Sequence, residues 1–301
     1  MKIAVTGAFS YSGKYITRRL LARGEEVITL TNHPNRGDPF DGKVKAYPLN
    51  FNDERGLVES LRGVETFYNT YWVRFDKGAN TQPAAVENTR KLVCAATEAS
   101  VKRIVHISIA NPSADSHLPY YWGKAANEKA VIDSGMSYAI LRPTVLFGKE
   151  DILINNIAWL LRHFPFFGLP GDGSYRLQPV FVDDLAALAV DAGYAKENIL
   201  CDAVGPDIFT FREMVELIGK TIGHIRQLIP IHPKLALGAA QFISLFVGDV
   251  LLTPEEVDGL MADILVSKEP PRAKTHLTDW LTENRETVGA RYASELKRHY
   301  S

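Results

Sequence analysis

Apolar positions follow two alternating spacings along the first half of the chain. Short runs rich in β-branched residues predict strands, and longer stretches with apolar residues three or four positions apart predict helices. The predicted strands cover 2–6, 25–30, 43–49, 64–71, 102–108 and 137–143, and the predicted helices begin near Ser12 and cover 53–62, 86–100 and 123–135. This alternation predicts an α/β fold with a doubly wound parallel sheet, to which a further strand at 198–204 also belongs.

The turn between the first strand and the first helix reads TGAFSYSG, residues 6–13. Gly7 lets the chain turn sharply, and Gly13 lets the helix approach the sheet closely. The amides at the start of the helix then point outward, where they can bind an anion such as a diphosphate. Ser10 stands in the middle of the turn where a glycine is usual, and its hydroxyl offers a replacement donor. The turn alone also fits an ordinary connection between a strand and a helix.

Composition limits the kind of ligand. Of the 301 residues 46% are hydrophobic, and the formal net charge is -1 without a basic block, which argues against nucleic acid or an anionic membrane as the main partner. We therefore expect a small molecule. Cys94 and Cys201 lie in apolar surroundings and predict buried thiols in a reducing compartment. Met1 runs directly into the first strand without a signal peptide, which favours a cytoplasmic protein.

One apolar run, Leu235 to Gly248, is shorter than the roughly 20 residues that a membrane-spanning helix needs. It predicts a buried helix and no transmembrane segment. A peripheral membrane surface or a protein-partner surface stays open as the alternative, because Phe242, Leu245 and Phe246 could share one helical face.

The stretch PYYWGK places Tyr120 and Lys124 four residues apart, on one face of a helix that follows the fifth strand. The ammonium can then reach the phenol and a bound ribose. A cation beside a phenol favours its charged form, which prepares Tyr120 for proton transfer to a carbonyl or from an alcohol. Two surface residues at a chance spacing are the alternative.

The end of the second strand, TLTNHPNR, bears on the choice of cofactor. An acid there would bind the ribose hydroxyls of NAD, and none stands between Glu26 and Asp38. Asn32, His33 and Arg36 would instead tolerate a 2′-phosphate, and Arg36 would add a charge-assisted contact. We therefore expect NADP, with NAD as the alternative.

Two further patterns favour structural roles. Asp183 and Asp184 are adjacent at a helix start, so they face different directions, and a helix N-cap is the simplest role for one of them. The eight histidines show no metal-ligand spacing, and His106 reads as a strand residue, so we expect no metal.

Several of these segments together resemble the extended and atypical short-chain dehydrogenase/reductases, including epimerase-like and NmrA-like proteins. The segments are TGAFSYSG, VENT with Asn88, KRIVHIS, YYWGK, NEKAVIDSGMSYAILRPTVLFG and QPVFVDDLA. NTYWVRF, RLQPVFVDDLA, LTPEEVDGL and HLTDWL are similar to the branch of the accessory subunit of respiratory complex I. The resemblance covers most of the chain and implies a Rossmann-like sheet that binds a dinucleotide.

The resemblance also implies roles for individual residues. Gly7, Ser10 and Gly13 match the diphosphate turn, Asn50 and Phe51 the adenine edge, Thr70 and Tyr71 the strand end near the ribose, and Pro143, Thr144 and Val145 the loop along the nicotinamide. Tyr120 and Lys124 match the catalytic pair. The complete expected cofactor set is Gly7, Phe9, Ser10, Tyr11, Gly13, Asn32, His33, Arg36, Asn50, Phe51, Thr70, Tyr71, Asn88, Ser108, Lys124, Pro143 and Val145.

The remaining chain is mostly helical, with one short strand at 225–231. We expect two interleaved domains: 1–150 with about 177–205 binds NAD(P), and 151–176 with 206–301 forms a smaller, mostly helical substrate domain. Such a cap would close a pocket over the carboxyl ends of the strands. Asn155, Arg162 and Arg176 are its candidate pocket residues.

Two functions remain in view. The chain could be an NAD(P)-dependent oxidoreductase or epimerase-like enzyme for an unknown small molecule, or a non-catalytic redox sensor or assembly subunit that binds the dinucleotide. Catalytic members of the family carry a hydroxyl where this chain has Ile109 or Ala110, which favours the second, although Ser113 or Ser116 could substitute. The retained Tyr120 and Lys124 favour the first.

Overall fold

The computed structural model of the chain describes residues 1–33, 37–294 and 296. Its internal contacts divide the chain into two compact units. The first unit consists of 1–143 and 182–203, and the second of 144–181 and 204–301. The chain therefore leaves the first unit after residue 143, returns to it at residue 182 and leaves it again after residue 203. That the second unit holds a substrate stays a prediction.

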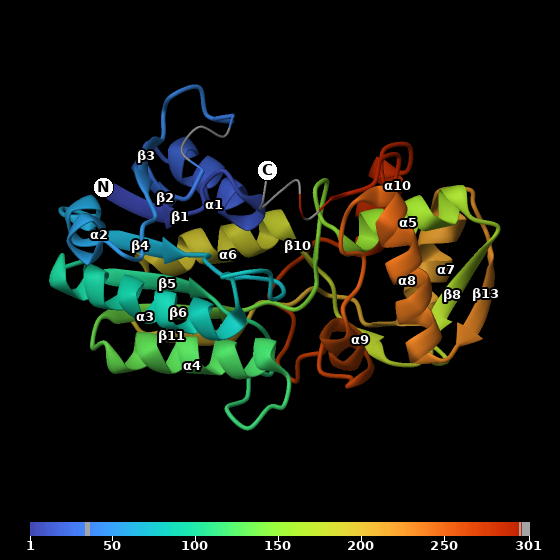
Figure 1. Cartoon of the computed structure of the whole chain (residues 1–301). Helices are drawn as coiled ribbons and strands as arrows, with labels where there is room; N and C mark the ends of the chain where they lie inside the picture. The colour runs from blue at the N-terminus through green and yellow to red at the C-terminus, as the bar shows by residue number, and fades with distance from the viewer. Residues whose placement is uncertain (34–36, 295, 297–301) are drawn as a thin grey trace. The chain divides into compact units, whose positions relative to one another are not determined.

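The first unit is built on a seven-stranded sheet in the order β11-β6-β5-β4-β1-β2-β3 (Figure 1). The strands are β1 (Lys2–Thr6), β2 (Glu26–Thr31), β3 (Lys45–Pro48), β4 (Thr66–Asn69), β5 (Arg103–Ile107), β6 (Ser137–Arg142) and β11 (Ile199–Asp202). Every neighbouring pair in it is parallel. The predicted α/β class with a doubly wound parallel sheet is confirmed, and so is the place of the late strand β11 beside β6.

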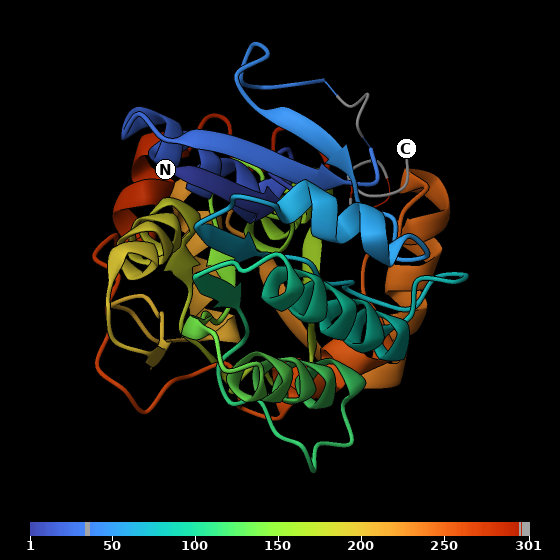
Figure 2. The same ribbon diagram turned by 90° about the vertical axis from the view of Figure 1, so that its left-hand side faces the viewer.

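Helices cover both faces of this sheet. They are α1 (Tyr11–Ala22), α2 (Glu54–Leu61), α3 (Gln82–Glu98), α4 (Pro119–Asp133) and α6 (Val182–Tyr194). Figure 2 shows α2, α3 and α4 side by side on one face, and α1 contacts α6 on the other. Buried residues such as Phe67, Ile104 and Ile140 of the strands meet Leu61 and Leu92 of the helices in one apolar core. Burial of these apolar side chains is the main contribution that stabilises the sheet, and it thereby fixes the positions of the strand ends.

Two helices begin earlier than their apolar spacing indicates. Helix α3 begins at Gln82 instead of residue 86, because Thr81 accepts a hydrogen bond from the amide of Ala84 and a proline occupies the first turn. Helix α4 begins at Pro119, before the predicted range of 123–135, again with proline in its first turn. Tyr120 and Lys124 lie on this one helix, as the spacing in PYYWGK predicts.

The second unit is mostly helical, as predicted for this part of the chain. Its helices are α5 (Leu153–His163), α7 (Phe211–Thr221), α8 (Pro233–Val247), α9 (Pro254–Met261) and α10 (Leu277–Asn284). Its strands are β7 (Leu146–Phe147), β8 (Phe166–Pro170), β9 (Arg176–Leu177), β10 (Val180–Phe181), β12 (Phe209–Thr210) and β13 (Gln227–Ile231). They pair as β7 with β10, β8 with β13 and β9 with β12.

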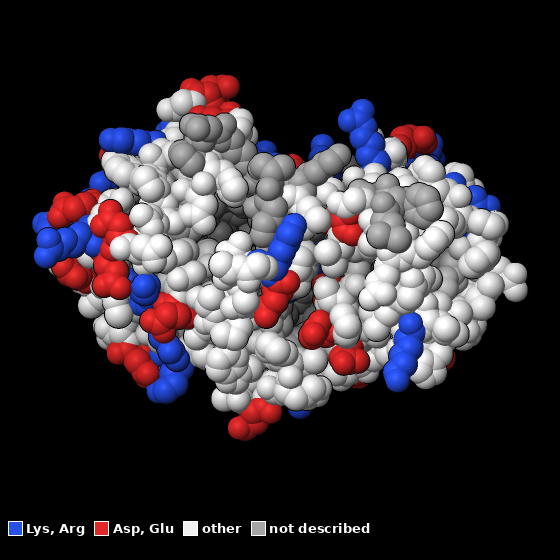
Figure 3. Space-filling model, viewed as in Figure 1, with Lys and Arg blue, Asp and Glu red and all other residues white. Residues whose placement is uncertain are grey.

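The prediction of a buried helix at Leu235 to Gly248 is only half right. Ala236 and Ala240 of α8 are buried, whereas the side chains of Leu235 and Phe242 are 67% and 62% exposed. One stripe of the helix packs while the opposite stripe faces outward, and Figure 3 shows few charged side chains over this part of the second unit. Of the predicted apolar face, the side chains of Leu245 and Phe246 lie outside the described ones. Within the described residues, no helix has the length and apolar character needed to cross a membrane.

The cysteine prediction is right for one residue and wrong for the other. Cys201 on β11 is buried, whereas Cys94 on α3 is exposed. The adjacent Val93 faces the core, so Cys94, about 100° further around the helix, points away from the core. Neither thiol is part of a disulfide.

Candidate functional site

The turn between β1 and α1 has the geometry of an anion site. Gly7 has φ +63°, a left-handed conformation that favours glycine. A Cβ at Gly13 would overlap the carbonyl oxygen of Gly7, so only glycine allows this approach of helix and strand. Ser10 precedes α1 but makes no side-chain cap, and the first turn holds no acidic residue. The amides of that turn are therefore available to an anion, and these residues fit a diphosphate.

The end of β4 lies directly beside this turn. The amide of Thr70 donates to Thr6 Oγ1 over 2.8 Å, and Thr70 Oγ1 donates to the carbonyl oxygen of Thr6 over 2.7 Å. Thr70 Oγ1 would also lie 3.8 Å from a Cβ at Gly7. Thr70 therefore joins the turn to the neighbouring strand end, and its place near a ribose stays a prediction.

Three expected cofactor residues from separate elements form one cluster. Asn88 on α3 donates through Nδ2 to the Tyr71 hydroxyl over 2.9 Å, and the rings of Tyr71 and Phe51 lie 5.0 Å apart. Nearby in sequence, Asn50 Oδ1 accepts from the amide of Asn52. The structure thus brings Phe51, Tyr71 and Asn88 together on one side of the sheet's carboxyl edge. Their role at an adenine or a ribose stays a prediction.

The residues expected to choose between NADP and NAD lie only partly within the described chain. Asn32 is exposed, and the amide of His33 donates to Thr31 Oγ1 over 3.1 Å. Arg36 lies outside the described residues. Asp38, the next acid along the chain, accepts from the amides of Phe40 and Gly42 in its own loop. Two aromatic residues of the turn pack within the first unit, Phe9 against Phe40 and Tyr11 against Tyr15.

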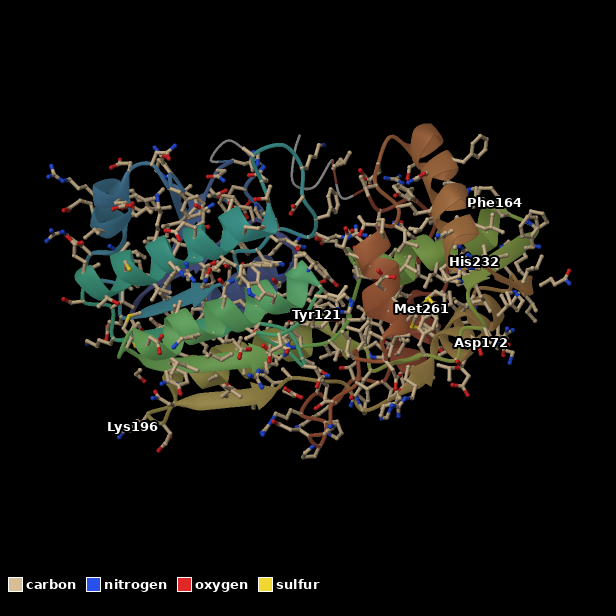
Figure 4. The ribbon with its side chains drawn as sticks, turned by 60° about the horizontal axis from the view of Figure 1, so that its bottom comes forward. Tyr121, Phe164, Asp172, Lys196, His232 and Met261 are labelled. Carbon is tan, nitrogen blue, oxygen red and sulfur yellow. The ribbon has the colours of Figure 1, made fainter. Side chains whose placement is uncertain are left out.

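The predicted catalytic pair lies at the start of α4, where Figure 4 labels the adjacent Tyr121. Lys124 is 3% exposed, and its Nζ donates to the carbonyl oxygen of Ile107 at the end of β5 over 2.9 Å. The ammonium lies 5.0 Å from the ring centroid of Trp72 and 5.9 Å from that of Tyr120. Burial lowers the pKa of Lys124 to about 7, and the nearby Glu128 opposes this shift.

A buried ion-pair network beside this pair was not predicted. Arg142 donates through Nε and Nη2 to the carboxylate of Glu128 over 2.9 and 2.5 Å, and Ser108 Oγ donates to the same carboxylate over 2.5 Å. Ser108 was expected to contact the cofactor, but its hydroxyl is buried against Glu128. The network joins β6 to α4 and fixes the helix that carries Tyr120 and Lys124.

Buried apolar residues occupy the positions where catalytic members of the family carry a hydroxyl. Ile109 and Ala110 are both buried. Of the suggested substitutes, Ser113 Oγ accepts from the amide of Asp115 and Ser116 Oγ accepts from the amide of Leu118. Each hydroxyl oxygen therefore accepts a hydrogen bond within its own loop, and its proton can still donate.

His106 is a buried residue of β5, as predicted, and its tautomer follows from its partner. Asn69 Oδ1 accepts from Thr6 Oγ1 and from the amide of Tyr71, which turns Asn69 Nδ2 toward His106 Nδ1 over 3.2 Å. Nδ1 is therefore the acceptor, and the proton lies on Nε2. Burial and the Lys124 charge lower the pKa of His106 to about 3, so the ring is neutral at pH 7.

The other suggested residues have structural partners. Asp183 accepts from Arg19 Nε and Nη2, both over 2.8 Å, which joins α6 to α1. In the second unit, Arg162 donates to the carbonyl oxygens of Val288 and Arg285, and Arg176 pairs with Asp263. Within the described part of the chain, no group of three His, Cys, Asp or Glu side chains could hold a metal ion.

The loop after β6 crosses from one unit to the other. The Pro143 carbonyl oxygen accepts from the amide of Ala110 within the first unit, and the Val145 carbonyl oxygen accepts from the amide of Val180 within the second. Thr144 Oγ1 donates to the carbonyl oxygen of Gln178. The role of Pro143 and Val145 along a nicotinamide stays a prediction.

Comparison of the sequence with known proteins finds similarity that includes the first unit. A family model described as NAD(P)H-binding matches residues 7–156. A curated relative from Arabidopsis thaliana, "NADH dehydrogenase (ubiquinone) 1 alpha subcomplex subunit 9, mitochondrial", is 25% identical over 287 residues, which cover 87% of this chain and 70% of the relative.

Solved structures extend the likeness to the whole fold. The NADPH-dependent quinone oxidoreductase QOR2 of Escherichia coli, complexed with NADPH, has a TM-score of 0.75 at 21% identity and covers 94% of this chain and 98% of its own. A dTDP-glucose 4,6-dehydratase variant of Streptomyces venezuelae with NAD bound has a TM-score of 0.70 at 19% identity and covers 97% and 98%. At these identities the likeness shows the fold alone.

Proposed function

We propose that the chain, which matches an NAD(P)H-binding family model over residues 7–156 and resembles the extended short-chain dehydrogenase/reductases, is an NAD(P)-dependent oxidoreductase or epimerase-like enzyme for a small molecule. In this proposal Tyr120 is the acid/base and Lys124 is its electrostatic aid. Gly7, Ser10 and Gly13 hold the diphosphate, and Thr70, Tyr71 and Asn88 line the path to the adenosine.

The buried ammonium of Lys124 is the observation that carries this proposal. Its single hydrogen bond goes to a backbone carbonyl, and Glu128, the nearby carboxylate, is already engaged by Arg142. A charged side chain in such a place costs free energy, and an apolar residue would pack there at lower cost. The position of Lys124 four residues after Tyr120 supplies a chemical reason for keeping it.

The chemistry of the pair follows from its charges. The nicotinamide, when bound, supplies or accepts the hydride. The Tyr120 hydroxyl gives its proton to the carbonyl oxygen as the alcohol forms, and it takes a proton in the reverse direction. A protonated Lys124 stabilises the phenolate that remains.

Non-catalytic dinucleotide binding is the second candidate. Ile109 and Ala110 are buried where a substrate-polarising hydroxyl is expected, and the Ser108 hydroxyl is held by Glu128. The Arabidopsis thaliana relative carries the name of a subunit of a larger dehydrogenase. A chain with this role would use the bound dinucleotide to hold a surface for a protein partner.

A substrate screen separates these two functions. Carbonyl compounds and nucleotide sugars are tested with NADPH and with NADH, and consumption of the cofactor is measured. We expect turnover of at least one compound, and a fall of about 100-fold or more in Tyr120→Phe, because the variant lacks the proton donor.

Cofactor preference is a separate prediction. We expect tighter binding of NADPH than of NADH, and loss of that preference in Arg36→Ala.

Two controls give the result its meaning. Tyr120→Phe should bind the dinucleotide as the original protein does, whereas Gly13→Val should not bind it, because a branched side chain would separate α1 from β1. Equal turnover in Tyr120→Phe would remove Tyr120 from the mechanism. Dinucleotide binding without turnover across the whole screen would favour the non-catalytic function.

A further inference from the structure

Trp72 lies against the catalytic pair although no function has been assigned to it. It follows β4 in the irregular stretch between Asn69 and Thr81, two residues after Thr70. A Cβ at Gly123 would be 2.5 Å from Cη2 of the Trp72 ring, so the indole approaches α4 where the helix has no side chain. The contact is specific to this sequence, because alanine at position 123 would push the ring away.

The indole packs against both members of the pair at once. Its ring lies 5.0 Å from Lys124 Nζ, and it meets the Tyr120 ring edge-on with centroids 5.6 Å apart and an interplanar angle of 81°. A cation over an indole face is attracted to it. The Ile107 carbonyl, the Trp72 ring and the Tyr120 ring together leave Lys124 only 3% exposed.

The position of Trp72 also leaves a donor unused. Trp72 Nε1 is buried and has no hydrogen-bond partner among the described residues. A buried donor without a partner is unfavourable, because it has lost its hydrogen bond to water. Movement of the indole would therefore relieve a cost as well as expose Lys124.

We propose that Trp72 is a positioning residue that covers Lys124 and is displaced when a dinucleotide binds. The inference rests on the proposed function of this site. In the covered state the ammonium is held on the Ile107 carbonyl. In the bound state the indole moves aside, and the ammonium donates to ribose hydroxyls in place of its contact with the ring. Trp72 thus makes the activation of Tyr120 depend on the presence of the cofactor.

Whether Trp72 covers Lys124 is tested first in the protein without a nucleotide. Purified protein is treated with an amine-acylating reagent, and the labelling rate of Lys124 is measured by mass spectrometry relative to Lys129, an exposed lysine of the same helix. We expect the ratio to rise about tenfold or more in Trp72→Ala, because the Lys124 amine becomes accessible to the reagent, which reacts with its deprotonated form. Trp122→Ala is the matched control, since Trp122 is a 37% exposed tryptophan on α4, and it should leave the ratio unchanged.

Two variants of similar size guard against a loss of folding in Trp72→Ala. Trp72→Phe keeps an aromatic face over the ammonium and should restore slow labelling, whereas Trp72→Leu fills space without such a face and should label faster. The pH dependence of labelling should also differ between them. Glu128 on α4, the neutral His106 on β5 and Tyr120 surround Lys124 equally in both, so the ring accounts for the difference. Equal ratios in all Trp72 variants would overturn the proposal.

Displacement is tested by titration with NADPH. We expect Trp72→Ala to bind NADPH about three- to tenfold more tightly, because no cation–π contact has to be broken. Weaker binding would show that the indole contacts the cofactor instead, which overturns the proposal. Absence of binding in the original protein and in Trp72→Ala would contradict the proposed function and the displacement together, while the labelling ratio would still decide whether Trp72 covers Lys124.

Discussion

Lys124 in the first unit and Asp151 in the second are equally buried, but their surroundings differ. Asp151 is 2% exposed, and it accepts from the amides of Ile154, Gly148 and Asn155 and from Asn155 Nδ2. Burial raises the pKa of Asp151 to about 7, and these hydrogen bonds oppose the shift. Lys124 has a pKa of about 7 for the same reason, but it makes one hydrogen bond.

The difference distinguishes a group with a structural role from one for which we propose a function. The contacts of Asp151 organise the start of α5 and the loop before it, and Asn155 extends this network by accepting from the amide of Gly289 near the end of the chain. Asn155 was a candidate pocket residue, and its side chain is used in this network instead. Among the described residues, Lys124 Nζ has one hydrogen-bond acceptor, the Ile107 carbonyl oxygen. Burial alone therefore does not distinguish these two groups, whereas the unused donors of Lys124 support its proposed function.

Removal of the Asp151 carboxylate should have the largest effect. Asp151→Ala should lower the free energy of unfolding by about 3 kcal/mol, because the amides at the start of α5 and Asn155 Nδ2 lose a buried acceptor. Urea unfolding at pH 6 measures the change. Asp151→Asn keeps one acceptor oxygen and should lose less. A loss below about 1 kcal/mol in Asp151→Ala would contradict the structural role.

Removal of the Lys124 charge should have the opposite sign. The folded pKa of about 7 lies below the ordinary lysine value of 10.5, so the unfolded chain binds more protons between these values. The stability of the original protein should therefore rise as pH increases from 7 toward 10. Lys124→Met lacks this rise and should be about 2 kcal/mol more stable than the original at pH 6, where the buried ammonium is charged.

The sign of this prediction is tested by the pH dependence of the difference in free energy of unfolding between Lys124→Met and the original protein. Unfolding of both proteins is followed at pH 6, 8 and 9.5, and the difference between them should shrink as pH rises. Other titrating groups cancel in that difference, because they are common to both proteins. A difference that grows with pH would mean that the fold does not lower the pKa of Lys124.

An exposed ion pair supplies the smallest expected effect. Arg176 and Asp263 in the second unit pair over 2.5 Å with half-exposed side chains. Because solvent screens such a pair, Arg176→Ala should change the free energy of unfolding by less than about 0.5 kcal/mol. A larger loss, measured by urea unfolding, would show that short distances alone decide stability here, and it would weaken the contrast drawn between Lys124 and Asp151.

The sequence predicts the sheet well because strand and helix signals are local. Each strand of the first unit is a short apolar run. Gly13, where a side chain does not fit, marks the turn. The range predicted for α4 from its apolar pattern begins only at residue 123, although the spacing of Tyr120 and Lys124 already places both on this helix and proline is common in a first helical turn. Cys94 was misjudged because its neighbours in sequence are apolar, whereas only every third or fourth helical position faces the core.

The contacts around the candidate site could not be predicted because they join distant segments. Ser108, Glu128 and Arg142 come from β5's end, α4 and β6, and nothing in their spacing pairs them. The contact of Trp72 with α4 had one signal, Gly123 inside a helix, where a glycine often marks a close approach. That signal does not say which residue approaches.

Because the chain returns to the first unit at residue 182, a shortened protein must keep this later segment if the first unit is to fold. A product that ends near residue 156 would contain the whole stretch matched by the family model, yet it would lack α6 and β11. Arg103 on β5 donates to the carbonyl oxygens of Ala192 and Glu197, and β6 would become an open sheet edge. Such a fragment should aggregate. A minimal dinucleotide-binding protein needs residues 182–203 joined after residue 143 through a new linker.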